Sequence, residues 1–302
     1  MTNRKFTTML SNTTNDHVAF RSHISSITAA LSAMGLVQTS DTGQLDIATI
    51  TVPGSFPAIA GYQIWRFNDA LQTTSPIFIK IGYGRYGSSL VGGTYLIVEI
   101  GTGTNGASTI TGVGSGSNIT LVYVYSFSEG GSSRQHMISS DGSGLAWSGN
   151  YDTGASVSLK FFFSIDRFRD SSGVPNGDGL LVFGKAQGES PAYTYTHDRV
   201  NNVVTTSRGG SLYPLLTPSV GSSSIQNSGA YPVSPIWFMA PGLGIYKTKM
   251  ALVFNGYDLG LDGEVPINYM GAVRNFKSQG TYQPSMDSMG QAFTSILQWW
   301  ND

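Results

Sequence analysis

Three sets of residues in this sequence could do chemistry: a glycine-rich loop, four histidines and eight carboxylates. The loop Gly101-Thr-Gly-Thr-Asn-Gly106 has the G-x-G-x-x-G spacing of dinucleotide-binding turns and follows an expected strand. Such a turn holds a pyrophosphate only when a helix begins directly after it, because the free N–H groups of that helix form the site. Residues 107–117 carry more glycines and β-branched threonines, which do not open a stable helix. We therefore expect a hairpin loop here and no bound nucleotide.

The four histidines do not form a metal site or a catalytic triad in the sequence. His17 and His23 lie six positions apart on an expected helix, on nearly opposite faces, whereas a helical metal site needs i, i+4 spacing. His136 and His197 are isolated, and no G-x-S-x-G motif is present. The absence of cysteine excludes disulfides, thiolate nucleophiles and Cys-ligated zinc. We expect no catalytic, cofactor-binding or metal-binding residues, and a protein that is not an enzyme.

The carboxylates are a third candidate set, because a glycoside hydrolase needs only two carboxyl groups for catalysis. The candidates are Glu99, Glu129, Asp166, Asp170, Glu189, Asp258, Asp262 and Glu264. The charges of Asp166-Arg-Phe-Arg-Asp170 alternate at a strand end, which we interpret as an exposed sheet edge with cross-strand ion pairs. Residues 170–179 offer oxygen atoms suited to Ca²⁺ but lack the regular spacing and the closing Glu of a calcium loop. Turn chemistry explains that segment better.

An N-terminal helix precedes the elements that would position these residues. Apolar residues recur at threes and fours over residues 16–34: Val18, Phe20, Ile24, Ile27, Leu31 and Met34. Asn15 or Asp16 can cap the start, and Gly35 suits the left-handed position after the last turn. This stripe leaves two possibilities open, because the helix could pack on its own domain or against copies of itself.

From residue 47 onward the pattern is typical of strands separated by turns rich in Gly, Ser and Pro. Strands are expected over residues 47–52, 62–67, 77–81, 95–100, 119–127, 157–165, 180–183, 193–196, 203–206, 245–254 and 269–276. Residues 291–300 could form a terminal strand or a short helix, and we favour the strand. No helical pattern alternates with them, which favours antiparallel sheets. The predicted fold is mainly β, with an antiparallel sandwich or barrel-like body and one N-terminal α-helix.

We divide the chain into an N-terminal arm and helix (1–46), a β domain (47–127) and a second β-rich region (128–302). The last region is expected to carry a long loop or arm at 207–235 and a docked C-terminal segment. Trp299 and Trp300 predict that docking, because a frayed tail should not carry two indoles. Their expected partners in burial are Phe293 and Ile296 or Leu297.

The amino-acid composition limits the classes of partner that the protein is expected to bind. Seventeen basic and eighteen acidic side chains leave a net charge of −1, which argues against nucleic-acid binding. Hydrophobic residues make up 40% of the chain, enough for a core, and charged residues only 12%. No stretch approaches the ~18 apolar residues of a membrane span, and no apolar signal segment follows Met1. We expect neither membrane insertion nor export.

One segment of the expected first β domain comprises Gly61-Tyr-Gln-Ile-Trp-Arg-Phe-Asn-Asp69, the strand that ends at Gly84, and residues 95–106. This segment resembles one shared by virion structural proteins of tailed bacteriophages. The resemblance implies a non-enzymatic, tail-associated virion component, assembled in the host bacterial cytoplasm with copies of itself and other virion proteins. The alternative is a phage receptor-binding, glycan-binding or depolymerase subunit that recognises a host surface glycan.

Overall fold

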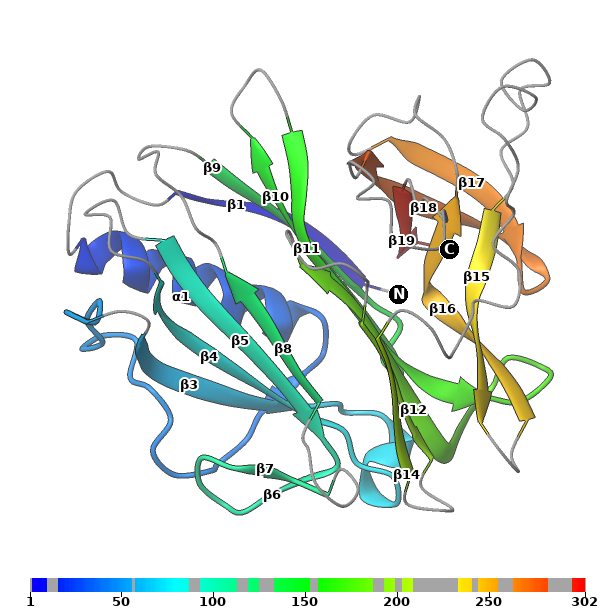
Figure 1. Cartoon of the computed structure of the whole chain (residues 1–302), viewed down its shortest axis with the longest axis horizontal. Coiled ribbons are helices and arrows are strands. Elements are labelled where there is room, and N and C mark those ends of the chain that lie inside the picture. Colours follow the sequence, from blue (N-terminus) through cyan, green and yellow to red (C-terminus); the bar gives the residue numbers. More distant parts are fainter. Residues whose placement is uncertain are drawn as a thin grey trace.

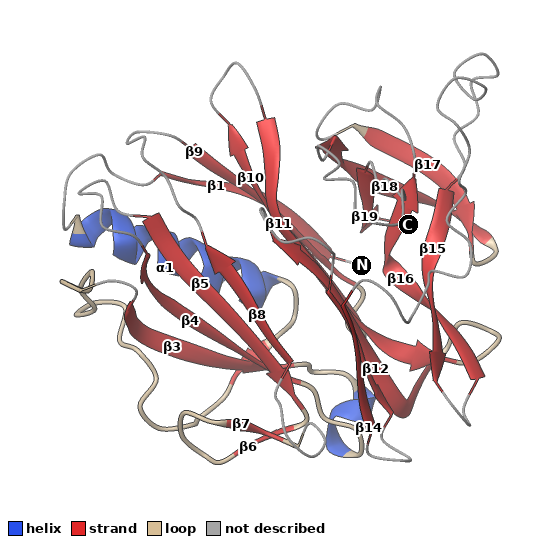
Figure 2. Ribbon diagram, viewed as in Figure 1, coloured by secondary structure: helices blue, strands red, loops and turns tan. Residues whose placement is uncertain are grey.

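The computed structural model describes residues 2–9, 16–55, 58–86, 93–112, 119–124, 133–152, 157–186, 193–198, 203–208, 233–240, 244–254, 263–281 and 295–301. These residues form three layers of antiparallel sheet and one long helix (Figures 1 and 2). The predicted fold class is confirmed: the protein is mainly β, with a sandwich-like body and an N-terminal α-helix. None of the described sheets closes into a barrel.

The middle layer, here called the central sheet, has the order β1-β9-β10-β11-β12-β13-β14. Its strands are β1 (Thr2–Met9), β9 (Ser133–Ser140), β10 (Gly144–Asp152), β11 (Val157–Arg169), β12 (Pro175–Ala186), β13 (Tyr193–Asp198) and β14 (Val203–Arg208). One flank is the N-terminal sheet, of β2 (Val37–Gln38), β3 (Ala58–Arg66), β4 (Phe78–Tyr86), β5 (Gly93–Gly101) and β8 (Ile119–Val124). The other is the C-terminal sheet, of β15 (Val233–Ala240), β16 (Gly244–Phe254), β19 (Ser295–Asn301), β18 (Ala272–Thr281) and β17 (Glu264–Tyr269).

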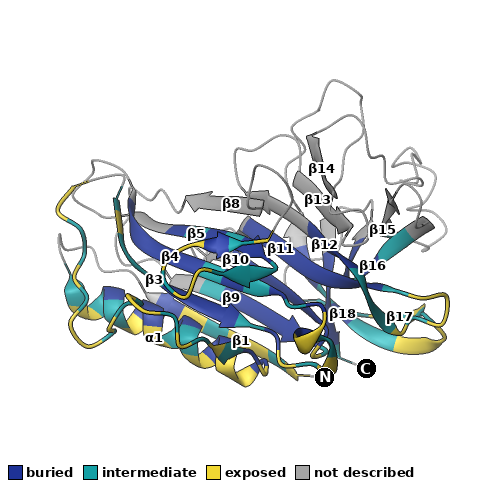
Figure 3. Ribbon diagram, turned by 90° about the horizontal axis from the view of Figure 1, so that it is seen from below, coloured by how far each residue is buried: buried dark blue, intermediate teal, exposed yellow. Residues whose placement is uncertain are grey.

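Helix α1 (His17–Ala33) packs into its own domain, which resolves the choice that the sequence left open. The Asp16 carboxylate accepts a hydrogen bond of 2.8 Å from the Ala19 N–H at its start, and Gly35 follows its end at φ +83°. The helix lies beside β1, with its outer face exposed (Figure 3). Its buried residues Phe20, Ile24, Ile27, Ala30 and Leu31 join the core between the N-terminal and central sheets. Val18, expected on the apolar face, is instead 74% exposed.

The central sheet is buried on both faces at β11, which explains the three consecutive phenylalanines of that strand, residues 161–163. Phe161, Phe163 and Ile165 pack toward the N-terminal sheet, whereas Phe162 and Phe168 pack toward the C-terminal sheet. A strand covered on both sides has no solvent face and needs no polar alternation. The protein therefore has two cores, one on each face of the central sheet.

Strand β1 was not predicted, and it links distant parts of the chain. It pairs with β9 from Thr2 opposite Ser140 to Met9 opposite Ser133. The Asn3 side-chain amide donates a hydrogen bond of 2.8 Å to the Trp300 carbonyl, so the two ends of the described chain meet (Figure 1). The division at residues 46 and 127 remains a prediction, although the first and third segments share one sheet.

Two of the expected strands are wrong. Residues 47–52 form no strand: residues 47–49 form a turn, in which the Asp46 carboxylate accepts hydrogen bonds from the Ala48 N–H (2.9 Å) and the Thr49 hydroxyl (3.1 Å), and residues 50–52 have no regular structure. These local bonds compete with strand pairing. Residues 269–276 are interrupted by the turn at Met270-Gly271, where both residues have positive φ, as a two-residue β-hairpin requires.

The docked C-terminal strand is confirmed. Trp299 is 0% exposed and Trp300 is 7% exposed in β19, and Leu297 is buried with them. Phe293 lies outside the described residues. Most of the expected arm at 207–235 also does, since residues 209–232 are not described, and β15 begins at Val233. Strands β9, β10 and β15 were not predicted.

Candidate functional site

The glycine-rich loop is a hairpin, as predicted. Strands β6 (Gly103–Thr104) and β7 (Ile110–Thr111) pair across it, and the structure shows no helix in residues 101–112. The Asn105 side chain accepts hydrogen bonds of 3.0 Å from the N–H groups of Ala107 and Thr109. Backbone groups that would hold a phosphate in a dinucleotide site are thus committed to the turn itself.

The carboxylates at the start of the Asp166–Asp170 segment are not at the exposed sheet edge that the sequence predicts. Strand β11 is internal to the central sheet, so the interpretation of Asp166–Asp170 as an exposed edge is wrong. Asp166 is 1% and Arg167 2% exposed. Glu99 and Glu264 pair with Lys80 and Lys277 respectively, each at 3.0 Å. Glu129, Glu189, Asp258 and Asp262 lie outside the described residues.

The pairing of β11 with β12 is irregular where the two arginines of β11 lie. The register shifts between Arg167, opposite Leu180, and Arg169, opposite Pro175, so the extra residues of this irregularity lie on β12. Arg167 donates to Asp69 in the turn after β3, whereas Arg169 reaches Asp141 together with Lys249 of the C-terminal sheet. One strand thereby fastens both neighbouring layers.

We call Asp141, Asp166, Arg169 and Lys249 the buried charge cluster. Asp141 Oδ2 accepts hydrogen bonds from Arg169 Nη2 at 2.9 Å and from Lys249 Nζ. Asp166 accepts a hydrogen bond from the Met250 N–H at 3.3 Å. The cluster joins the β9–β10 turn, β11 and β16, which come from two layers.

The two carboxylates of this cluster have opposite electrostatics. Burial is the dominant cause and raises the pKa of Asp166 to about 7, against the opposing charge of Arg169; the repulsion of Asp141 adds to the rise, and the backbone hydrogen bonds from Met250 and Lys249 reduce it. Burial also raises the pKa of Asp141, but Arg169, Lys249 and the hydrogen bonds to Asp141 outweigh it and lower that pKa to about 2. Such a separation is typical of acid and base pairs in enzymes. Here Asp166 is 1% exposed, which keeps a substrate from reaching it.

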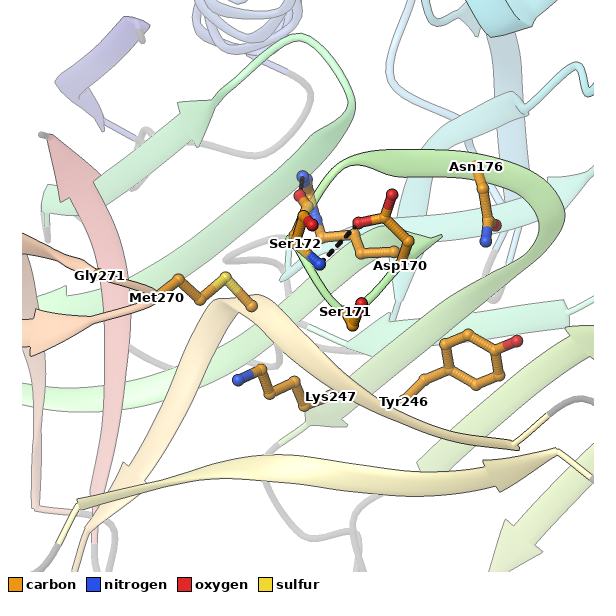
Figure 4. A pocket seen from close by; sticks show the side chains of 10 residues that line it. Asp170, Ser171, Ser172, Asn176, Tyr246, Lys247, Met270 and Gly271 are labelled. Carbon is orange, nitrogen blue, oxygen red and sulfur yellow. Dashed lines mark hydrogen bonds between the residues drawn. The ribbon is translucent and has the colours of Figure 1, made fainter.

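A polar hollow of about 660 Å³ adjoins the buried charge cluster, and Arg169 belongs to both. Its walls are the β11–β12 turn (residues 170–173), Asn176, two residues of β16 and the Met270-Gly271 turn. Figure 4 shows the turn's side chains between Met270 and Lys247 on one side and Asn176 and Tyr246 on the other. This hollow is the accessible candidate site among the described residues.

The turn chemistry expected for residues 170–179 is confirmed over residues 170–174, which shape this hollow, whereas residues 175–179 belong to β12. The Asp170 Oδ1 atom accepts hydrogen bonds of 2.9 Å from the N–H groups of Ser172 and Val174. Asn176 Oδ1 accepts one of 3.1 Å from the Asp178 N–H. The oxygens that could have suggested a calcium loop therefore stabilise backbone turns.

Two histidines that are 113 positions apart in sequence meet in the core, which sequence spacing could not reveal. The rings of His23 and His136 have centroids 5.8 Å apart. The Trp147 Nε1–H donates to His136 Nδ1 at 3.3 Å, and His136 Nε2 lies 3.2 Å from the Thr8 hydroxyl. These contacts join α1, β1 and the central sheet. His17 Nδ1 accepts from the Val52 N–H, and the side chain of His197 is not described.

The segment that ends at Asp69 connects two layers of the structure. Asp69 receives two hydrogen bonds from Arg167, of 2.5 Å to Oδ2 and 2.8 Å to Oδ1. Arg167 also donates to the Ser75 carbonyl at 2.6 Å, and its side chain is fully buried. The turn after β3, including the 3₁₀ helix Ala70–Thr73, is thereby fixed to the central sheet.

Across the described segments, no three His, Asp or Glu side chains converge as metal ligands. Helices in this same part of the chain are too short or too polar to span a bilayer. Comparison with known proteins identifies no matching family model, no similar curated protein and no similar solved structure.

Proposed function

We propose that this chain is a non-enzymatic structural component of a tailed-bacteriophage virion, tail-associated, and that it acts through assembly with copies of itself and other virion proteins. The observation that supports the proposal is the buried, bidentate ion pair between Asp69 and Arg167. Asp69 closes the segment that resembles phage virion proteins, and its partner lies 98 positions away in another layer. That segment therefore serves to hold layers together.

A second joint supports the same proposal. Gln298 of β19 donates hydrogen bonds to the carbonyls of Met137 (3.2 Å) and Ala146 (3.1 Å) and accepts one from the Ser148 hydroxyl at 3.0 Å. Gln279 of β18 donates to the same Gln298 oxygen at 3.0 Å. A fully bonded polar network in a core specifies one arrangement of the sheets. A fixed arrangement of the sheets makes the subunit rigid, which suits a component of a virion.

The low charge of the chain supports assembly with neighbours. Only 12% of its residues are charged, against about 25% in an average soluble domain. A surface with few charges is poorly protected against association. In the proposed function this surface is covered by other subunits, no nucleic acid is bound, and the protein is assembled in the bacterial cytoplasm.

Mass spectrometry of separated head and tail fractions tests the proposal, using particles purified from the bacterium that makes the chain. We expect its peptides in washed tail fractions, in several copies per particle. Its absence from washed particles would refute the proposal. Sedimentation of the protein released from particles should show an oligomer, or a monomer that rejoins them.

The polar hollow favours a second candidate function, that of a subunit that binds a host surface glycan. The hollow combines an aromatic ring with carboxylate, amide, hydroxyl and ammonium groups. Such mixed walls suit ligands with both polar and apolar faces. Direct attachment of the purified protein to host cells, removed by stripping the cell-surface glycans, tests this function.

A further inference from the structure

We propose that the side chains of Asp141 and Lys249 condense into an intramolecular isopeptide bond, which joins the central and C-terminal sheets covalently. The Lys249 Nζ atom donates a hydrogen bond to Asp141 Oδ2, although the two residues lie 108 positions apart in the sequence. Asp141 lies in the turn between β9 and β10, and Lys249 lies in β16. This modification does not depend on whether the chain is part of a virion.

The Asp141–Lys249 pair is the most buried of the lysine–carboxylate pairs that the structure describes. The side chains of Asp141 and Lys249 are 9% and 13% exposed. The Nζ atom lies 3.7 Å from the ring centroid of Trp299, which is itself fully buried. Burial lowers the pKa of Lys249, although the charge of Asp141 opposes this effect. The neutral amine, which is the nucleophilic form of lysine, therefore forms at a lower free-energy cost than in water.

The carboxyl group of Asp141 is held in the way that an electrophile requires. Its Oδ1 atom accepts two hydrogen bonds of 2.9 Å, from the Ser143 N–H and from the Ser143 hydroxyl. These donors stabilise the negative charge that develops on Oδ1 when a nucleophile adds to the carboxyl carbon. The Oδ2 atom accepts from Arg169 as well as from Lys249, so two cations hold the oxygen that leaves.

The condensation needs no co-reactant, because the ammonium and carboxylate groups contain every atom of the products. One proton moves from Nζ to Oδ2 along their hydrogen bond, which leaves a neutral amine beside a neutral carboxylic acid. The nitrogen lone pair attacks Cγ of Asp141, the N–C bond forms, and one C–Oδ1 electron pair moves onto Oδ1. A second proton passes from the nitrogen to the Oδ2 hydroxyl. The electron pair then returns from Oδ1, the Cγ–Oδ2 bond breaks, and Oδ2 leaves as water.

The folded structure favours this reaction in two ways. The Nζ atom lies no farther from Cγ than one C–O bond length beyond its contact with Oδ2, so the reacting atoms are already together. Groups held in this way react as if each were present at about 10⁵ M or more. Burial also removes the hydration that stabilises the separate ions in water.

Intact-mass spectrometry of the purified, folded full chain tests the inference. We expect a mass that is one water molecule below the mass of the sequence. Tryptic digestion should leave the chain uncut after Lys249 and give a branched peptide that contains both Asp141 and Lys249. Lys249→Arg keeps the cation but replaces the amine by a guanidinium, which stays protonated, so this variant should have its full mass. The matched control, Lys80→Arg in the pair with Glu99, should keep the loss of water.

Ser143→Ala tests the role of the hydrogen bonds to Oδ1. It removes one of the two donors and leaves the Asp141–Lys249 contact in place. The cross-linked fraction, followed with time after a short pulse of protein synthesis, should therefore rise about tenfold more slowly or less. A rate equal to that of the unmodified sequence would show that these donors do not assist the reaction and would refute that part of the inference.

Two results would overturn the isopeptide bond itself. The first is a full sequence mass in protein that circular dichroism shows to be folded. The second is a loss of water that persists in Lys249→Arg, because the Asp141-Gly142 sequence can also lose water by closing into a succinimide with its own backbone. A branched peptide that is present in the Lys80→Arg control and absent from Lys249→Arg would establish the bond.

Discussion

Replacing Asp166 by Asn tests the electrostatics of the buried charge cluster. Burial raises the pKa of Asp166 from 3.8 to about 7, so the folded protein holds this proton more tightly than the unfolded chain does. The favourable contribution is complete below about pH 4 and is lost as pH rises through about 7. A pKa difference of about 3 corresponds to about 4 kcal/mol at pH values above 7. Asn is neutral throughout and can still accept the hydrogen bond from the Met250 N–H.

Thermal unfolding of both proteins, followed by tryptophan fluorescence between pH 5 and pH 8.5, measures the effect. Asp166→Asn should raise Tm by about 8 °C at pH 8.5, at about 2 °C per kcal/mol, and the gain should shrink steadily toward pH 5. The same substitution at the half-buried Asp178, which lies outside the buried charge cluster, serves as the control. A gain in Tm that is the same at every pH, or a loss of stability at pH 8.5, would refute the reasoning.

Three further substitutions test the packing. Arg167→Met leaves the Asp69 carboxylate without its buried partner and should cost about 3 kcal/mol or more in urea denaturation; a change below about 1 kcal/mol would contradict this joint. Gly84→Ala places a Cβ 2.0 Å from a carbonyl oxygen of β3 and should prevent folding, as seen by circular dichroism, whereas Gly54→Ala, with no atom within 4 Å, should leave Tm unchanged. Trp299→Ala removes a fully buried indole and should cost about 3–5 kcal/mol in the same denaturation assay.

Local sequence was sufficient wherever neighbouring residues alone decide the conformation. Helix α1 begins at an Asp cap and ends before a glycine with positive φ, and both signals act within one turn. The hairpin at residues 101–106 was predictable because the following residues cannot form a helix. The docking of Trp299 and Trp300 followed from the cost of leaving two indoles in water.

At residues 47–52 the wrong prediction has a local cause: the segment has the apolar content of a strand, yet the neighbouring Asp46 side chain stabilises a turn at residues 47–49. Elsewhere the prediction was wrong where a distant layer changes what a residue contacts. The alternating charges of Asp166–Asp170 predict an exposed sheet edge, because alternating charge usually faces solvent. Their burial depends on two other sheets that cover both faces of β11, and no nearby residue signals those sheets.

The candidate site also combines features that the sequence predicts with features that depend on the tertiary structure. The sequence predicts turns over residues 170–179, and the Asp170 side chain does stabilise a turn over residues 170–174, although residues 175–179 join β12. It could not indicate that Tyr246, Lys247 and Met270 lie around those turns, because they reach the hollow from other strands. Capping bonds form between residues a few positions apart, so sequence alone determines them. Which strands face one another across a layer depends on the packing of whole sheets, and only the tertiary structure decides that.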